Sequence, residues 1–521
     1  MYGDPTLHIP EEMAELLPKV RFDPVSLEIT VPEEIFWILS DEARRVISPF
    51  IEHGVLDLWK FLREGWSKHA DAKQIYLETS AQGRFELHLV IAAYHHEAVH
   101  KIDLLTTPLG ASWLCLLVDE FALLERYIPV ALAHQSAPAG LAIYRHIERS
   151  QLPAALETAP VELQSLWSAL EFQVMRTLAW GDLRQRRPLG KPTPGWQGLG
   201  ATQAYNLLNT ARVFELVEYG GVATIQPKDQ SEQFIRPLAI LEAKAISAAL
   251  LWILSVSPDP GTDVAAYWRL LYSDQRSSLH HDYFFVLDTI AVYFGRRDFD
   301  DLIFKACVPE AGSNLKDQLR QVLLVATGIC WYALHTPPMR DKREFRLFGL
   351  NPVIRLIVGL RDGPQWLRQQ MQAEAGPTSS AQMATGIEQG QSAFLLQQYP
   401  VSETIARSRR VLEQIAGLSE MSIRHNSTRS WFRRVADLML PQLEPRDHYN
   451  SLIGMPDDGN PWATLRSNED ADLLDTKSLL GADMMGWSRL RRELLLLDVA
   501  PSKIDPDVVL RASQMFGIGK S

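Results

Sequence analysis

The stretch His96-Glu97-Ala98-Val99-His100 decides how this chain of 521 residues is interpreted. Residues four apart on an α-helix lie one turn above each other on the same face. His96 and His100 can therefore direct two imidazoles at one metal ion, which is how HExxH helices hold zinc. Glu97 lies one position round the helix, where it can reach a metal-bound water without touching the metal. That is the position that a general base requires.

A third ligand is expected from a second helix that begins shortly after the first. Thr107 and Pro108 form a helix-start pattern, with Thr107 as the N-cap and Pro108 at the first helical position. Glu120 lies within the apolar pattern that follows, and a buried carboxylate needs a cation or hydrogen-bond donors to offset its desolvation. The sequence therefore predicts a zincin-like pair of packed helices over 92–127, with Glu120 facing the histidines.

The order His96-Glu97-x-x-His100, followed by Glu120, resembles the zinc site of the gluzincin metallopeptidases. The resemblance covers residues 96–120 only. It implies a zinc cofactor held by His96, His100 and Glu120, and a water activated by Glu97. The function expected from it is that of a zinc-dependent peptidase or related amide hydrolase, with a peptide or protein as its substrate.

Hydrolysis of an amide also needs a hydrogen-bond donor to the oxyanion in the transition state. The segment 270–283 concentrates such donors on one helical stretch. We expect the donor to be one of four side chains: Tyr272, His280, His281 and Tyr283.

The whole chain is predicted to be mainly α-helical, with short β-hairpins. Alternating apolar residues around Ser80-Ala81-Gln82-Gly83 predict one hairpin at about 74–90, and a Gly220-Gly221 turn predicts another at about 213–226. The composition, 46% hydrophobic and 22% charged, is that of an ordinary globular protein. Proline- and glycine-rich stretches suggest five segments: an extended lead-in over 1–40, a helical and hairpin domain with the zinc site over 41–183, a helical domain over 200–368, a linker or exposed loop over 369–391, and a C-terminal helical region over 392–521.

Two other functions remain open. A non-catalytic, all-helical interaction or immunity-type scaffold accounts for the Trp- and Leu-rich helices, but not for the coincidence of the histidines with Glu120. The patterns Arg276-x-x-x-x-His281 and Arg63-x-x-x-x-x-His69 resemble the short motif of HEPN-type ribonucleases, although about three such matches are expected by chance. The sequence has no P-loop, no Cys-x-x-Cys pair and no Gly-x-Ser-x-Gly elbow, so P-loop nucleotide hydrolases, zinc ribbons and α/β serine hydrolases lack support.

The net charge of −11 argues against a general nucleic-acid binder. Within 407–434, however, arginines are concentrated, and they could face an anionic partner or lie on solvated helix faces paired with glutamates. These arginines are Arg407, Arg409, Arg410, Arg424, Arg429, Arg433 and Arg434.

Three cysteines, each in an apolar run, predict buried free thiols in a reducing compartment: Cys115, Cys307 and Cys330. The first residues lack the basic and apolar regions of a classical signal peptide. The longest uncharged apolar run, 245–257, is too short to span a bilayer. We therefore expect a cytoplasmic protein without a membrane partner.

Overall fold

The computed structural model describes residues 11–52, 55–56, 70–133, 160–179, 199–200, 234–235, 237–273, 281–308, 312–336, 400–417 and 426–443, together with short segments at 352, 355–361, 363, 386–388 and 423. Over these residues the protein is predominantly α-helical, as the sequence predicts. The predicted hairpin at 213–226 lies outside them, and the division into five segments stays a prediction.

The described helices and strands have the following bounds. The N-terminal part contains α1 (Glu11–Leu16), η1 (Leu17–Lys19), β1 (Arg21–Asp23), β2 (Glu28–Thr30), α2 (Glu33–Ile38), α3 (Asp41–Ile47), η2 (Ser48–Phe50), β3 (Ile51–Glu52), β4 (Val55–Leu56), α5 (Ala70–Glu78), α6 (Ala81–Thr106) and α7 (Pro108–Ala133). The middle contains α10 (Val161–Ala179), β5 (Leu199–Gly200), β6 (Phe234–Ile235), α13 (Pro237–Val256), α14 (Pro260–Trp268), the π-helical turn η4 (Arg269–Ser273), α15 (His281–Tyr293), α16 (Phe299–Ala306) and α17 (Ser313–Leu334). The last elements are α20 (Val401–Gly417), α21 (Asn426–Met439) and η8 (Leu440–Leu443).

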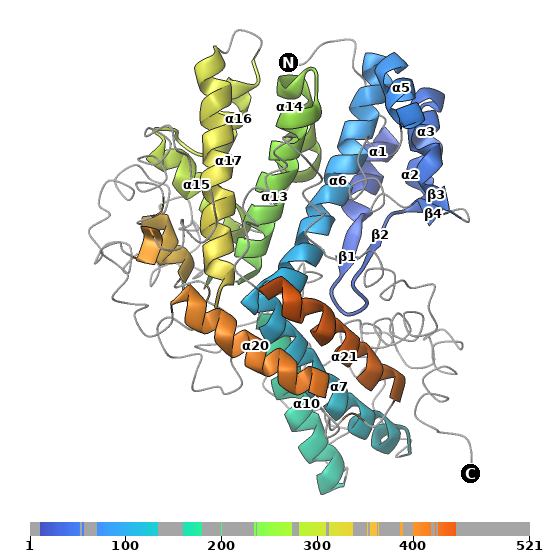
Figure 1. Ribbon diagram of the computed structural model, residues 1–521, viewed down its shortest axis with the longest axis vertical. Coiled ribbons are helices and arrows are strands. Elements are labelled where there is room, and N and C mark those ends of the chain that lie inside the picture. Colours follow the sequence, from blue (N-terminus) through green and yellow to red (C-terminus); the bar gives the residue numbers. More distant parts are fainter. Residues whose placement is uncertain are drawn as a thin grey trace.

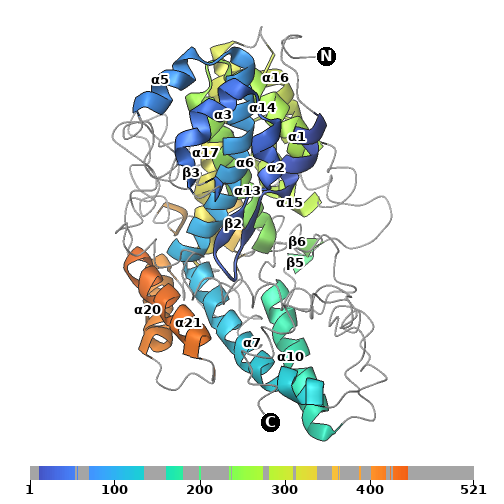
Figure 2. The ribbon, with the colours of Figure 1, turned by 90° about the vertical axis from the view of Figure 1, so that its right-hand side faces the viewer.

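The helices form two groups, which α6 and α7 join. In the upper half of Figure 1, α13 packs between α6 and α17, and α14, α15 and α16 lie around them. In the lower half, α10, α20 and α21 pack on α7. The buried apolar side chains of both groups form one continuous core. Within the described residues the strands pair as two-stranded antiparallel sheets, and β1 and β2 lie against α6 (Figure 2).

The predicted hairpin at 74–90 is wrong, because α5 and α6 occupy that stretch. Ser80, expected in the turn, is instead the N-cap of α6, and its side chain accepts a hydrogen bond from Gly83 N. Over 84–90 the alternation of apolar residues misled because α6 is buried around most of its circumference. A helix with several apolar faces has no clear helical period, so the short runs within it can look like strands.

A sharp bend separates α6 from α7. The backbone is extended at Thr107, which ends α6, and Pro108 begins α7 as predicted. Gly110 allows a close approach there, because a Cβ at this position would lie 1.7 Å from the carbonyl oxygen of Leu104. The predicted helix pair over 92–127 therefore exists, but the two helices meet at an angle of 81° and do not pack along each other.

Helix α13 takes the place beside α6 that the sequence assigned to α7. It starts at Pro237 and ends before Pro258-Asp259-Pro260-Gly261, a run of residues that breaks helices. The stretch Ala239–Val256 is long and apolar enough to cross a membrane, and 72% of it is buried inside the protein. The helix carries two charged residues, Glu242 and Lys244, and both contact α6.

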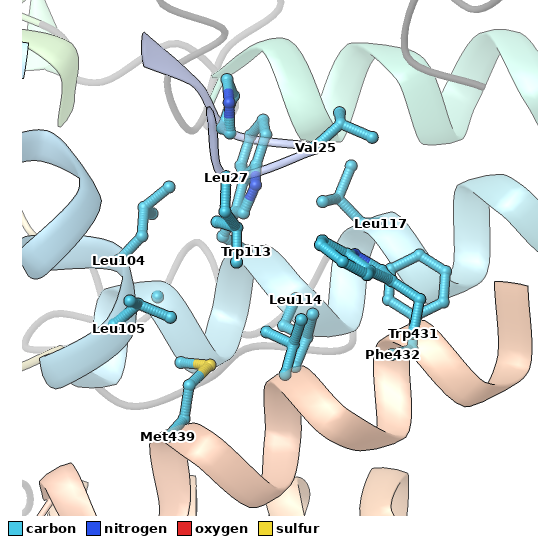
Figure 3. Close-up of a pocket in the computed structure, with 13 residues that line it drawn as sticks. Val25, Leu27, Leu104, Leu105, Trp113, Leu114, Leu117, Trp431, Phe432 and Met439 are labelled. Atoms are coloured by element: carbon cyan, nitrogen blue, oxygen red, sulfur yellow. The ribbon is translucent and has the colours of Figure 1, made fainter. Parts of the chain in front are cut away.

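An apolar pocket lies where α21 and the β1–β2 connection meet the bend (Figure 3). Trp113, Leu114 and Leu117 of α7 line it together with Trp431 and Phe432 of α21 and with Val25 and Leu27 of the β1–β2 connection. None of the residues that line this pocket belongs to the HExxH segment, and its walls are almost entirely apolar. The pocket is therefore a gap in the packing between the two helix groups, and it is separate from the polar side chains of the HExxH segment.

Candidate metal centre

The two histidines of the HExxH segment converge on α6. The Nε2 atoms of His96 and His100 lie 3.2 Å apart, and the two rings are nearly perpendicular, with centroids 4.8 Å apart. Both side chains are buried, with residue exposures of 7% and 2%. The helical spacing of four thus produces the convergence that the sequence predicts.

A carboxylate from α13 completes the group. The Glu242 Oε2 atom lies 3.3 Å from His96 Nε2, and Glu242 Oε1 lies 3.6 Å from His100 Nε2. The ligand atoms of these three residues all lie within 4.8 Å of one another. Among the residues that the structure describes, this is the group of histidine and acidic side chains that could hold a metal ion.

Glu242 therefore replaces Glu120 as the carboxylate beside the histidines. Glu120 is fully buried, but it lies in α7, beyond the 81° bend, and does not belong to the group. At 1.5 Å per residue, His100 stands about 10 Å before the bend and Glu120 about 18 Å after it. The one signal for Glu242 in the sequence is that it is a carboxylate in an apolar helix. Other buried carboxylates of this chain share that property, so the signal alone does not select Glu242.

Burial and the carboxylate set the protonation of the histidines. Burial lowers the pKa of His100 to about 3, so its imidazole is neutral, the form that binds metals. Burial also opposes a charge on His96, but the hydrogen bond and negative charge of Glu242 outweigh it and raise the pKa of His96. Glu242 thus favours a positive charge beside His96, and a metal cation would supply one.

Glu97 lies next to the group, and a backbone donor holds it. The Phe22 N–H group of β1 donates to Glu97 Oε2 over 2.7 Å. Burial raises the pKa of Glu97 to about 7; the charge of His96 opposes this shift, and that of Glu242 adds to it. A carboxylate with a pKa near neutrality is suited to accept and release a proton.

One of the four proposed oxyanion donors contacts His96, but at the ring nitrogen that faces away from Glu242 and His100, so its role as an oxyanion donor stays a prediction. The Tyr272 hydroxyl lies 3.1 Å from His96 Nδ1, and burial raises the Tyr272 pKa well above its ordinary value, so the hydroxyl stays protonated. Behind it, the Tyr267 hydroxyl donates to the carbonyl oxygen of Ala92 over 3.3 Å. His280 and the side chains of His281 and Tyr283 lie outside the described residues.

Other histidines of α6 have partners of their own. His88, two turns before His96, has its Nδ1 atom 2.6 Å from Asp263 Oδ2 and its Nε2 atom 2.9 Å from the Tyr76 hydroxyl. His95 stacks on Trp252, with ring centroids 6.2 Å apart. His88 therefore offers a matched control for His96, since it is a buried histidine on the same helix outside the metal group.

Within the described residues, the arginines that the sequence analysis singled out do not contribute to the group formed by His96, His100 and Glu242. Arg407 and Arg410 pair with Glu403 at 3.6 and 3.3 Å, and Arg433 donates to the Ala416 carbonyl oxygen. These contacts fit the interpretation as solvated helix faces, and an anionic partner stays a prediction. Arg409, Arg429 and Arg434 lie on the same two helices. Arg424, Arg63, His69 and Arg276 lie outside the described residues, so the structure does not test the ribonuclease motifs.

No protein family, curated protein or solved structure matches the chain.

Proposed function

We propose that the protein is a zinc-dependent hydrolase that cleaves peptide or related amide bonds. The observation that carries this proposal is the convergence of the three side chains on one point. The two imidazole nitrogens lie 3.2 Å apart, and each lies close to a different carboxylate oxygen of Glu242: His96 Nε2 is 3.3 Å from Oε2, and His100 Nε2 is 3.6 Å from Oε1. Zinc bonds of about 2.0–2.1 Å in a tetrahedron place neighbouring ligand atoms about 3.3 Å apart. The two nitrogens therefore already have the spacing of zinc ligands, and Glu242 offers either oxygen as the third.

The donor set supports catalysis more than a structural role. Structural zinc sites usually have four protein ligands, whereas catalytic sites have three and keep one position open for water or substrate. Two histidines and one glutamate are a common catalytic set. Within the described part of the chain, no fourth histidine, cysteine or acidic residue joins His96, His100 and Glu242.

Glu97 supplies the general base in this proposal. Zinc in such a site acidifies a bound water and polarises the carbonyl of the substrate. Glu97 accepts the proton of the attacking water and passes it to the leaving amine. The Phe22 N–H group donates to Oε2 and restrains the Glu97 carboxylate, which interacts electrostatically with His96 and Glu242. The choice of an amide substrate rests on the resemblance of the HExxH segment to the gluzincin peptidases.

The metal is tested first, by elemental analysis of the purified protein with and without added zinc. We expect about one zinc per chain, lost in His96→Ala because a catalytic site has only three protein ligands. The control variant His88→Gln should keep the metal, because His88 is not part of the metal group and its two ring nitrogens contact Asp263 and Tyr76 instead. Wild-type protein without zinc above background would refute the proposal in favour of a helical scaffold.

The reaction is tested with Glu97→Gln, which preserves the size of the side chain and much of its hydrogen bonding. We expect zinc to remain bound while turnover falls on the order of a hundredfold or more. The assay compares wild type with the variant on a peptide library, read by mass spectrometry. Equal product patterns, or no products from zinc-loaded wild type, would leave a structural metal site and overturn the catalytic proposal.

A further inference from the structure

The hydroxyl of Tyr272 contacts the one nitrogen of His96 that does not face the metal group. His96 directs Nε2 at Glu242 and His100, and its Nδ1 atom lies 3.1 Å from the Tyr272 oxygen. Tyr272 is itself buried, with a residue exposure of 9%. Histidine ligands usually bond a second protein group through their other ring nitrogen, and this bond selects the tautomer and fixes the ring.

A local irregularity of the backbone brings a second tyrosine behind the first. Tyr267 and Tyr272 are five residues apart, a spacing that places side chains about 140° apart around an α-helix. Residues 269–273 instead form a π-helical turn, whose bonds join residues five apart and bring them onto one face. The two rings lie with centroids 6.0 Å apart, and the interaction between the hydroxyls acts to lower the pKa of Tyr267 and to raise that of Tyr272, which is the pattern of a Tyr272 O–H that points at the Tyr267 oxygen.

The Ala92 carbonyl oxygen, at one end of this series of contacts, determines which group donates and which accepts in each of them. The Ala92 carbonyl oxygen can only accept, so the Tyr267 hydroxyl donates to it. The Tyr267 oxygen is then the acceptor for the Tyr272 O–H, and the Tyr272 oxygen is left to accept from His96 Nδ1–H. In the opposite direction Tyr272 would donate to Nδ1 and place the imidazole proton on Nε2, where it would block metal binding.

We propose that Tyr272, supported by Tyr267 and the Ala92 carbonyl oxygen, is a positioning residue. It holds His96 in the Nδ1–H tautomer, with the Nε2 lone pair directed at the metal. This inference rests on the proposed zinc site and deepens it. By contrast, His100 Nδ1 has no hydrogen-bond partner among the described residues, so the relay acts on one of the two imidazoles.

The test measures zinc affinity by competition with a chelator in wild type, Tyr272→Phe and Tyr267→Phe. Loss of an outer-shell partner typically weakens metal binding about 10–100-fold, and we expect a loss of this size in Tyr272→Phe. Tyr267→Phe should act in the same direction, because the Tyr272 hydroxyl loses its acceptor and can donate to His96 instead. The second variant also covers the case in which Tyr272→Phe does not fold.

The matched control is Tyr127→Phe, which removes the hydroxyl of a buried tyrosine in α7 that has no hydrogen-bond partner among the described residues. It should bind zinc as wild type does. If wild type binds zinc and both Tyr272→Phe and Tyr267→Phe bind it with unchanged affinity, the positioning role is overturned while the zinc site stands. The same conclusion follows if Tyr127→Phe weakens zinc binding as much as the two relay variants do. Wild type that binds no zinc would refute the metal site itself. The visible spectrum of the cobalt-substituted protein gives a second readout. A reoriented His96 changes the ligand geometry and therefore the spectrum, whereas the loss of a tyrosine that only stabilises the fold leaves the spectrum of the bound cobalt unchanged.

Discussion

The Nε2 atom of His96 lies 3.3 Å from the Oε2 atom of Glu242, although the two residues belong to helices far apart in the sequence. The contact exists because α13 packs along α6 in the centre of the core. The candidate site is therefore a product of tertiary packing. Its two histidines come from one helical turn, and its carboxylate comes from the neighbouring helix.

Glu242 and Glu120 can be distinguished by the metal content of two matched variants. Glu242→Gln removes the negative charge and a ligand from the group, so we expect loss of zinc comparable to that of a histidine variant. Glu120→Gln removes a buried carboxylate beyond the bend and should keep its zinc. Elemental analysis of the folded fraction of each variant measures its zinc content and distinguishes the two candidate ligands. Zinc retained in Glu242→Gln and lost in Glu120→Gln would restore the ligand set expected from sequence alone.

The sequence predicted the local half of the site, because a spacing of four is a property of one helix and needs no knowledge of the fold. His96, His100 and the neighbouring Glu97 follow from it. The third ligand depends on which helix packs beside α6, and short-range patterns do not encode this. Proximity along the chain favoured Glu120, but the extended backbone at Thr107 turns α7 away.

The boundaries of the helices were predictable where a proline or a capping residue marks them. Pro108 begins α7 at the expected residue, and Pro237 likewise begins α13. The hairpin predicted at 74–90 is wrong for the opposite reason over 84–90, since α6 is buried on several sides there and gives no clear period. Tyr272 was found as a candidate, but its partner Tyr267 was not, because only a π-helical turn brings residues five apart together.

A second contact between α6 and α13 predicts a large effect on stability. Lys244 Nζ and the Asp103 carboxylate form an ion pair, and both side chains are almost completely buried. Lys244→Met leaves a buried carboxylate without its partner, which should cost about 3–5 kcal/mol of unfolding free energy. The double variant Asp103→Leu with Lys244→Met should recover most of this loss, because it removes both charges. Urea unfolding measures the free energies, and additive losses in the double variant would contradict the prediction.

Gly110 predicts a steric requirement at the bend between α6 and α7. A Cβ at this position would lie 1.7 Å from the Leu104 carbonyl oxygen and 2.8 Å from its Cα atom, and backbone atoms cannot move as a flexible side chain does. Gly110→Ala should therefore destabilise the protein by at least the roughly 1–3 kcal/mol typical of overpacking. Gly417→Ala is the control, because its Cβ would meet no atom within 4 Å. If Gly110→Ala unfolds at the same urea concentration as wild type, the bend has room for a Cβ and the predicted steric requirement is wrong.

The three cysteines are free, and they predict a pH-dependent difference in thiol reactivity. Cys115 and Cys330 are buried, as expected from their apolar surroundings, whereas Cys307 is only partly buried at the end of α16. Burial raises the pKa of Cys307 to about 12 from an ordinary value of 9.0. The thiolate is the reactive form, so the folded protein at pH 8 should be alkylated slowly although part of Cys307 is accessible.

The pH profile separates a shifted pKa from simple lack of access. Below the pKa, the thiolate fraction of Cys307 rises about tenfold per pH unit, so its alkylation rate should keep rising between pH 8 and 11. An ordinary thiol would level off once the pH passes about 9, and a thiol without access would stay slow throughout. Mass spectrometry of iodoacetamide-treated folded protein follows Cys307 by its own peptide. The protein unfolded in guanidinium is the control and should show rapid reaction at all three cysteines with a plateau near pH 9. A plateau at the same pH for Cys307 in the folded protein would contradict the raised pKa.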